Sequence, residues 1–269
     1  MTTPWCPMRR AGNPADARRV AEFLELTERE QASGGVGAKQ AALVDEMVFQ
    51  RLTKEVLRAW RRHAYATPPD IRAAYDAACD ALFYVVLWNS GLRASDALRL
   101  NTAQFVFTRT NTYIQIGVTK RFTTLEDTHR ITIHEDAVNA DPLYSVVAAW
   151  KVLSSTLDAA DVLPIDRNGA MFRALVQAED GSWALGTAHS WSTMHTRHVE
   201  WLKRAGFNDV GRRTITLHSF HGSRAAREQK AGISREVTCD NMRWTTEMYD
   251  YYTKGREPLI LDDVLRSTT

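Results

Sequence analysis

The sequence has few cysteines and almost no net charge, and each shortage excludes a class of protein. Its 269 residues include three cysteines, 34 Lys and Arg, and 32 Asp and Glu, so the formal net charge is only +2. Cys6, Cys79 and Cys239 form no C-x-x-C pair, which argues against a disulfide framework and a structural zinc site and favours an intracellular protein. A hydrophobic content of 44% and a charged content of 25% are typical of a globular chain rather than a disordered one.

Long apolar runs and several familiar catalytic motifs are also missing. The longest apolar stretch, residues 81–88, is far shorter than the ~20 residues of a membrane span, so we expect a buried helix there. The amino terminus lacks the apolar segment of a secretory signal. There is no GxxxxGK[ST], HExxH or GxSxG sequence. His189, His195 and His198 lack cysteine or carboxylate partners, so we expect neither a metal site nor a cofactor.

Periodicity predicts an α+β, mainly helical fold with a small antiparallel β-sheet. Segments 104–108, 112–116 and 130–133 are rich in β-branched and aromatic residues and predict the strands. Residues 166–186 are expected to be irregular. The expected helices begin near Thr53, run over 71–88 between an Asp70 cap and Gly91, follow a Ser95 cap to Leu100, and span Asp141–Leu153, about Ser192–Gly206, and Leu217 onward.

Four segments, taken in order, carry the chemistry that we expect. Residues 88–100, WNSGLRASDALRL, place Arg93 on a turn after a buried helix, and residues 114–120, IQIGVTK, end in a lysine. Residues 217–226, LHSFHGSRAA, precede AGIS at 231–234, and residues 242–254, MRWTTEMYDYYTK, contain three tyrosines. Together they resemble the motifs of the tyrosine recombinases of the lambda-integrase and Cre type. The HSF turn and the Arg-Trp pair resemble most the eukaryotic mobile-element recombinases of the Crypton and DIRS kinds.

The resemblance implies a domain organisation. Residues 46–256 would form a tyrosine recombinase catalytic domain. Residues 1–45, which are polar and include Ser33–Gly37, would be an arm or the remnant of a core-binding domain. Residues 257–269 would be a tail that docks onto a neighbouring protomer.

The resemblance also implies residue roles. Arg93 would bind the scissile phosphate, Asp96 would support that site, and Lys120 would be the general acid. Trp244 matches a position that the family fills with His or Trp, and its indole N–H could bind the phosphate. The expected reaction cleaves and rejoins DNA strands through a covalent 3′-phosphotyrosine without metal.

The family's H-x-x-R motif aligns in two ways. If His218 is its histidine, Gly232 and Trp244 follow at the usual separations without a gap, and His221 takes the place of the second arginine. If His221 is the histidine, Arg224 completes the motif but about three residues must be deleted. We favour the first alignment, in which Arg224 is the only nearby substitute for the missing arginine and the expected enzyme would be attenuated. Loss of one oxyanion donor typically costs ~10²–10³ in rate.

Three tyrosines compete for the role of nucleophile. Tyr252 stands eight residues after Trp244 and matches the family spacing within one residue, so we favour it. Tyr249 is the second candidate and shares a helix face with Tyr252, whereas Tyr251 is rotated by about 100°. A phenol suits this role because the phosphotyrosyl bond conserves the energy needed for rejoining.

Local charge supports double-stranded DNA as the partner. Residues 201–256 hold eleven Lys and Arg against six acidic residues, so the near-zero total hides a basic segment. We expect a tetramer on paired sites, in the nucleus of a eukaryote or the cytoplasm or nucleoid of a prokaryote. The alternatives are a DNA-binding protein that keeps the fold without catalysis and an enzyme of the type IB topoisomerase or telomere-resolvase kind. The expected DNA-binding residues are Arg58, Arg61, Arg62, Arg121, Arg227 and Arg243.

Overall fold

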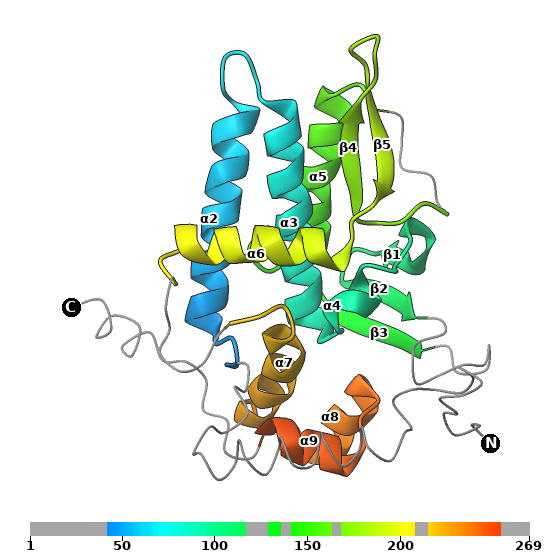
Figure 1. Cartoon of the computed structure of the whole chain (residues 1–269). Helices are drawn as coiled ribbons and strands as arrows, with labels where there is room; N and C mark the ends of the chain where they lie inside the picture. The colour runs from blue at the N-terminus through cyan, green and yellow to red at the C-terminus, as the bar shows by residue number, and fades with distance from the viewer. Residues whose placement is uncertain (1–41, 117–128, 136–140, 163–167, 208–214, 254–269) are drawn as a thin grey trace, which may run out of the picture. The chain divides into compact units, whose positions relative to one another are not determined.

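The computed structural model describes residues 42–116, 129–135, 141–162, 168–207 and 215–253. The chain divides into two compact units, and all the described residues belong to the one formed by Ala41–Gly211 and Ile215–Thr269. The predicted domain boundaries at residues 45 and 256 stay predictions. Along the chain (Figure 1), the described elements are α2 Glu46–Ala64, α3 Ile71–Ser90, α4 Ala94–Ala97, η2 Thr102–Gln104, β1 Phe105–Phe107, β2 Asn111–Ile116, β3 His129–His134, α5 Val146–Ala159, β4 Arg173–Gln177, β5 Trp183–Ala188, α6 Trp191–Arg204, α7 Ser219–Lys230, α8 Arg235–Met242 and α9 Thr246–Thr253.

Helix α3 is the central helix of the described core, and the sequence predicted it well. Asp70 caps it by accepting a hydrogen bond from the backbone N–H of Ala73, and Gly91 ends it in the left-handed conformation at φ +65°. Nearly every side chain from Ala74 to Trp88 is buried, because α2, α5 and α7 pack around it. The apolar stretch is therefore a buried helix, as predicted. No described helix is both long and apolar enough to cross a membrane.

The predicted start of the first helix was wrong. Helix α2 begins at Glu46, where the side chain of Asp45 accepts from the N–H of Val48 at 2.7 Å. Thr53 lies inside the helix, fully buried, and its hydroxyl donates to the carbonyl of Phe49. Asp45 is the better cap because the buried stripe of the helix already starts at Val48.

Two further predicted helix starts were misplaced. Helix α4 begins at Ala94 after Arg93, without a side-chain cap, and Ser95 lies exposed inside it. Helix α5 begins after Ser145, whose hydroxyl accepts from the N–H of Ala148 at 3.0 Å, rather than at Asp141. Asp141 instead caps the preceding turn by accepting from the N–H of Leu143.

The predicted sheet is present and has three antiparallel strands in the order β1-β2-β3. Its register pairs Ile114 with Ile131 and Ile116 with His129. Ile114 and Ile131 are buried, so one face of the sheet joins the core. The segment that joins β2 to β3, which includes Lys120 and Arg121, lies outside the described residues.

The expectation of an irregular region at 166–186 was wrong from Arg173 onward. Strands β4 and β5 form an antiparallel hairpin closed by a turn at Gly181, where φ is +85°. Arg173 reinforces it, because its guanidinium donates to the carbonyls of Gly186 and Leu185 at 2.7 and 3.0 Å. Most of its side chains are partly or fully exposed, so the alternating apolar pattern that predicts a strand is weak.

Helix α6, which starts within one residue of its predicted position, crosses α2 and α3 (Figure 1). The guanidinium of Arg197 pairs with Asp76 at 3.1 Å and with Asp80 at 2.8 Å. Trp201 donates its indole N–H to Asp80 at 2.6 Å. These contacts hold α6 to α3 with a partly buried ion cluster, in which each charge has an opposite partner.

Helices α7, α8 and α9 complete the described chain, as the helical pattern after Leu217 predicts. They enclose a second, smaller apolar cluster. Helix α7 also packs against the end of α3. This contact brings the three C-terminal helices to the turn that carries Arg93. The small cluster consists of Ala225, Cys239, Trp244, Tyr249 and Tyr252.

Candidate active site

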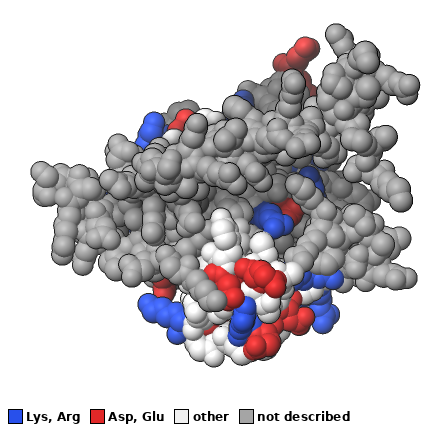
Figure 2. Space-filling view, turned by 60° about the horizontal axis from the view of Figure 1, so that its bottom comes forward, with Lys and Arg blue, Asp and Glu red and all other residues white. Residues whose placement is uncertain are grey.

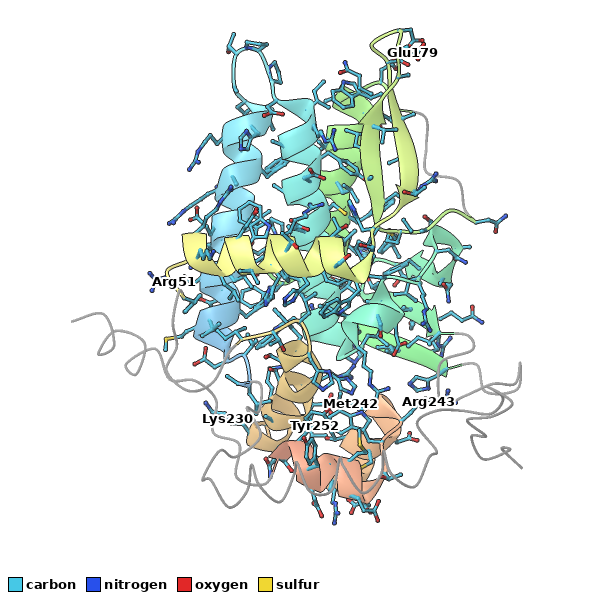
Figure 3. All side chains as sticks on the ribbon, viewed as in Figure 1. Arg51, Glu179, Lys230, Met242, Arg243 and Tyr252 are labelled. Atoms are coloured by element: carbon cyan, nitrogen blue, oxygen red, sulfur yellow. The ribbon has the colours of Figure 1, made fainter. Side chains whose placement is uncertain are left out.

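A cleft lies where the end of α3, the paired ends of β2 and β3 at Ile116 and His129, and helices α7 and α8 meet. Figure 3 shows Met242 and Arg243 at the end of α8, with Tyr252 of α9 beside Met242. Residues from four separate segments therefore converge here. The residues that line the cleft are Ser90, Gly91, Leu92, Arg93, Asp96, Ile116, His129, Ile131, His221, Asn241, Met242, Arg243 and Trp244.

Arg93 reaches the cleft because α3 ends abruptly. The N–H of Gly91 closes the last helical turn onto the carbonyl of Leu87, and the chain then leaves in a new direction. A Cβ on Gly91 would lie 2.8 Å from the side chains of Arg224 and Met242, so only glycine fits both the conformation and the space. Arg93 is half-buried and lines the cleft together with Asp96.

Tyr252 forms a hydrogen bond with His218. Its hydroxyl lies 2.6 Å from Nε2 of the imidazole, and the two rings are tilted at 51°. The phenol ring is 4% exposed, whereas His218 is exposed to solvent. An imidazole at this distance can take the phenol proton and release it to water.

The other two tyrosines lie differently. Tyr249 is buried, and the guanidinium of Arg235 lies over its ring at 5.8 Å. Burial raises the pKa of its hydroxyl. Tyr251 is 56% exposed and touches Tyr252 edge-on. The prediction that Tyr249 and Tyr252 share a face while Tyr251 points elsewhere is confirmed.

His221 lies one helical turn from His218 and is 5% exposed. Its Nδ1 donates a hydrogen bond to the carbonyl of Gly91. Its ring packs edge-on against Trp244 at 4.9 Å and Tyr252 at 5.5 Å. Burial lowers its pKa to about 3, and the nearby Arg93 adds to this effect. The imidazole is therefore neutral at pH 7.

Trp244 packs against both His221 and Tyr252. Its ring stacks on Tyr252 with centroids 4.7 Å apart and an interplanar angle of 26°. The preceding residue, Arg243, has φ +52°, a left-handed turn that ends α8 and directs Trp244 inward. The backbone N–H of Trp244 donates to the carbonyl of Cys239 at 2.8 Å, and this hydrogen bond fixes the turn.

Arg224 does not line the cleft. Its Nε donates to the carboxylate of Glu228 at 2.8 Å, and an Nη donates to the carbonyl of Ser90 at 2.6 Å. Arg227 is also engaged within the protein, since it donates to the carbonyl of Trp88 and covers that ring at 4.0 Å. Burial lowers the pKa of Arg227 to about 10. Both arginines hold the end of α3 against α7.

The group Arg58, Arg61 and Arg62 is not brought to the cleft. These exposed side chains lie near the end of α2 beside the start of α3, whereas the cleft lies at the end of α3. At 1.5 Å per residue the two ends of α3 are ~30 Å apart. Arg58 also lies 3.5 Å from Glu55.

The three clustered histidines are held in separate contacts. His189 accepts from Arg197, His195 stacks on Trp191, and Nδ1 of His198 bonds the hydroxyl of Tyr84. Within the described ranges, no group of three His, Cys, Asp or Glu residues is placed to hold a metal ion.

Comparison with solved structures identifies the fold. The XerH site-specific recombinase, in a post-cleavage complex with a palindromic difH substrate, superposes with a TM-score of 0.52 at 14% identity. This match covers 81% of the present chain and 50% of the XerH chain, so the protein spans about half of that relative's length. The XerA recombinase superposes with a TM-score of 0.50 at 14% identity, covering 95% of this chain and 82% of XerA. This is the fold of the tyrosine recombinase catalytic domain.

The similarity is visible in structure rather than in sequence. No protein-family model and no curated protein matches the amino-acid sequence. At 14% identity the likeness shows the recombinase fold alone. The predicted α+β, mainly helical class with a small antiparallel sheet is therefore confirmed.

Within this recombinase fold, the described cleft lining includes one titratable residue that the sequence reasoning missed. His129, the first residue of β3, lines the cleft, and its Nε2 donates to the carbonyl of Asn241 at 3.3 Å. Burial lowers its pKa. Its alternation with the buried Ile131 was a usable signal, because residues two apart on a strand share a face. This hydrogen bond ties the start of β3 to the last turn of α8.

Proposed function

We propose that this protein is a tyrosine recombinase that cleaves and rejoins DNA through a 3′-phosphotyrosine at Tyr252. The observation that carries the proposal is the 2.6 Å hydrogen bond between the Tyr252 hydroxyl and His218, beside the Arg93 cleft and within this fold. We assign its partner as double-stranded DNA, and its working form as a homo-tetramer on paired sites inside the cell.

The proposed step is a transesterification, in which the phosphorus of one DNA phosphodiester passes from its 5′ oxygen to the oxygen of Tyr252. The Tyr252 oxygen attacks phosphorus, its proton passes to His218, and the bond from phosphorus to the 5′ oxygen breaks. Arg93 binds the non-bridging oxygens with two parallel N–H groups. Lys120 protonates the leaving 5′ oxygen. Rejoining is the reverse of this step, so no bond energy is lost and no metal is needed.

Lys120 belongs to the segment between Ile116 and His129, both of which line the cleft. Four residues of chain after Ile116 span at most ~13–14 Å when extended. This reach supports Lys120 as the general acid and Arg121 as a neighbouring phosphate contact.

The ungapped alignment of H-x-x-R is the one that this geometry supports. His218 is bonded to the tyrosine and His221 lines the cleft, whereas Arg224 is occupied by Glu228 and Ser90. His221 therefore takes the place of the second phosphate-binding arginine, and we propose that the enzyme is slow for this reason.

A covalent trap tests the proposal. Duplex DNA of degenerate sequence carrying bridging 5′-phosphorothiolate linkages would be incubated with the protein, because the released thiol rejoins poorly and the adduct accumulates. We expect an adduct in the wild type and in Tyr249→Phe but not in Tyr252→Phe. The matched control matters because Tyr249 is equally buried on the same helix. An adduct that survives in Tyr252→Phe would contradict the assignment.

A second candidate function is a DNA-binding protein without catalysis, which the neutral His221 favours. It predicts retention of the DNA in a gel without any covalent adduct, in the wild type and in His221→Arg alike. An enzyme of the type IB topoisomerase or telomere-resolvase kind would form the adduct but act on one site alone. The Crypton and DIRS placement is a further proposal that rests on the HSF and Arg-Trp sequences.

A further inference from the structure

One nitrogen of His221 is buried without a hydrogen-bond partner. The side chain is 5% exposed, and Nε2 has no partner within the described part of the chain. The other nitrogen, Nδ1, bonds the carbonyl of Gly91. Since a carbonyl can only accept, the proton of the neutral ring must sit on Nδ1. Nε2 therefore carries a lone pair that no described group satisfies.

The surroundings of His221 are mainly cationic or neutral. Arg93 faces it from the turn after α3, and His218 faces it from α7. Arg224 on the same helix is paired with Glu228, and Tyr252 and Trp244 cover the ring from α9 and the turn before it. The remaining titratable groups of the cleft are Asp96, His129 and Arg243.

A phosphate or sulfate oxygen is an acceptor, so it repels the lone pair of a neutral His221. Once Nε2 is protonated, the same atom becomes a charged donor that can bind the oxyanion. We propose that this cleft binds an oxyanion, in the enzyme the scissile phosphate, only together with one proton taken up at Nε2 of His221. This inference rests on the proposed function and adds to it a coupling between substrate binding and pH.

An arginine in this position would behave differently. Its guanidinium keeps its charge at every physiological pH, so binding would involve no proton. With His221 the anion supplies the field that holds the proton on a ring which is otherwise neutral. Binding coupled to one proton weakens by up to about tenfold for each unit of rising pH.

Sulfate is a suitable probe because it remains a dianion over the range of interest. Calorimetric titration in two buffers of different ionisation enthalpy measures the protons taken up per sulfate bound. We expect an uptake approaching one proton at pH 6 and an affinity that falls about tenfold between pH 6 and pH 7. In His221→Arg we expect tighter binding, no uptake and no pH dependence. His218→Gln is the control for the neighbouring ring and should keep the uptake.

A measurement on the wild type avoids reliance on a buried substitution. The ¹⁵N resonance of Nε2 in His221 should move from the unprotonated to the protonated position when sulfate is added at pH 6. Sulfate binding without this change, or no sulfate binding by the wild type at pH 5, would overturn the inference. An adduct at Tyr252 with no proton uptake on sulfate binding would contradict the proton coupling and leave the proposed recombinase activity standing. Proton uptake with no adduct in the wild type or in His221→Arg would contradict the proposed recombinase activity and leave the proton coupling standing.

Discussion

The contact between Tyr252 and His218 depends on Gly222, which lies on α7 one helical turn after His218. A Cβ on Gly222 would lie 2.7 Å from Cδ1 of Tyr252 and 2.8 Å from a methyl group of Leu43. Helices α7 and α9 can therefore approach closely only while this position lacks a side chain. Gly222 has an ordinary helical conformation, so the requirement concerns space and not backbone strain.

Gly222→Ala should accordingly displace the tyrosine. We expect the free energy of unfolding to fall by about 1–3 kcal/mol through overpacking. We also expect adduct formation to slow at least tenfold in the folded protein, because the phenol leaves hydrogen-bond distance of His218. Urea unfolding and the phosphorothiolate trap measure the two effects. Gln229→Ala, an exposed substitution on the same helix, should change neither, and a Gly222→Ala protein with normal trapping would contradict this role.

At the scale of the element, α6 is held to α3 by polar contacts that are sensitive to acid. His198 of α6 is fully buried, with Nδ1 3.0 Å from the hydroxyl of Tyr84 in α3. Burial lowers its pKa to about 3, and the pKa of His189 to about 4. Burial acts in the opposite direction on Asp80, raising its pKa to about 6.

The sign of the histidine effect follows from proton binding. Unfolded histidine has a pKa near 6.5, so between about pH 3 and 6.5 the unfolded chain binds a proton that the buried His198 does not. Stability from this group is complete above that window and is lost as the pH falls through it. In His198→Asn, the slope of unfolding free energy against pH should drop by about 1.4 kcal/mol per unit between pH 5 and 6. Urea unfolding at several pH values tests this, and the exposed His134→Asn should keep the slope.

Elements with a strong local signal were predictable, and those fixed by tertiary contacts were not. The unbroken apolar run before Gly91 identified α3 and the position of Arg93. The start of α2 was misjudged because Asp45 and Thr53 are both good caps by type, and only the burial of Val48 decides between them. The β4–β5 hairpin was missed because pairing, rather than a buried apolar face, stabilises it.

The same division applies to the candidate site. Arg93, His218, His221, Trp244 and Tyr252 could be selected from motif order, and the structure brings them together around one cleft or its edge. The hydrogen bond of His129 to Asn241 joins two segments that are remote in sequence. The space required at Gly222 is set by Tyr252 on the neighbouring helix α9. No local pattern reports such contacts. The occupation of Arg224 by Glu228 likewise needed the packed structure.

At the scale of the whole molecule, the basic residues do not gather on the α8–α9 face. Residues 235–253 carry two basic side chains against four acidic ones. The view from that side shows both signs interspersed over the described surface (Figure 2). The basic excess of residues 201–256 therefore lies outside these two helices and the turn between them. The six charged residues of this segment are Arg235, Glu236, Asp240, Arg243, Glu247 and Asp250.

The distance between the cleft and the arginines of α2 predicts that the proposed DNA binding and the proposed chemistry can be separated by mutation. Arg61 and Arg62 lie ~25–30 Å from Arg93 along α3, so we expect them to contact phosphates several base pairs from the cleaved bond. Log affinity falls with log salt by about 0.9 per phosphate contact, so losing two contacts should make this negative slope shallower by about 1.8. In the double variant Arg61→Gln, Arg62→Gln we expect this reduced slope together with an unchanged trapping rate at saturating DNA. Arg93→Gln should do the reverse at the chemical step, lowering the trapping rate by ~10²–10³. Fluorescence anisotropy from 50 to 200 mM salt provides the slope, and a double variant with the wild-type slope would show that DNA does not reach this end of α2.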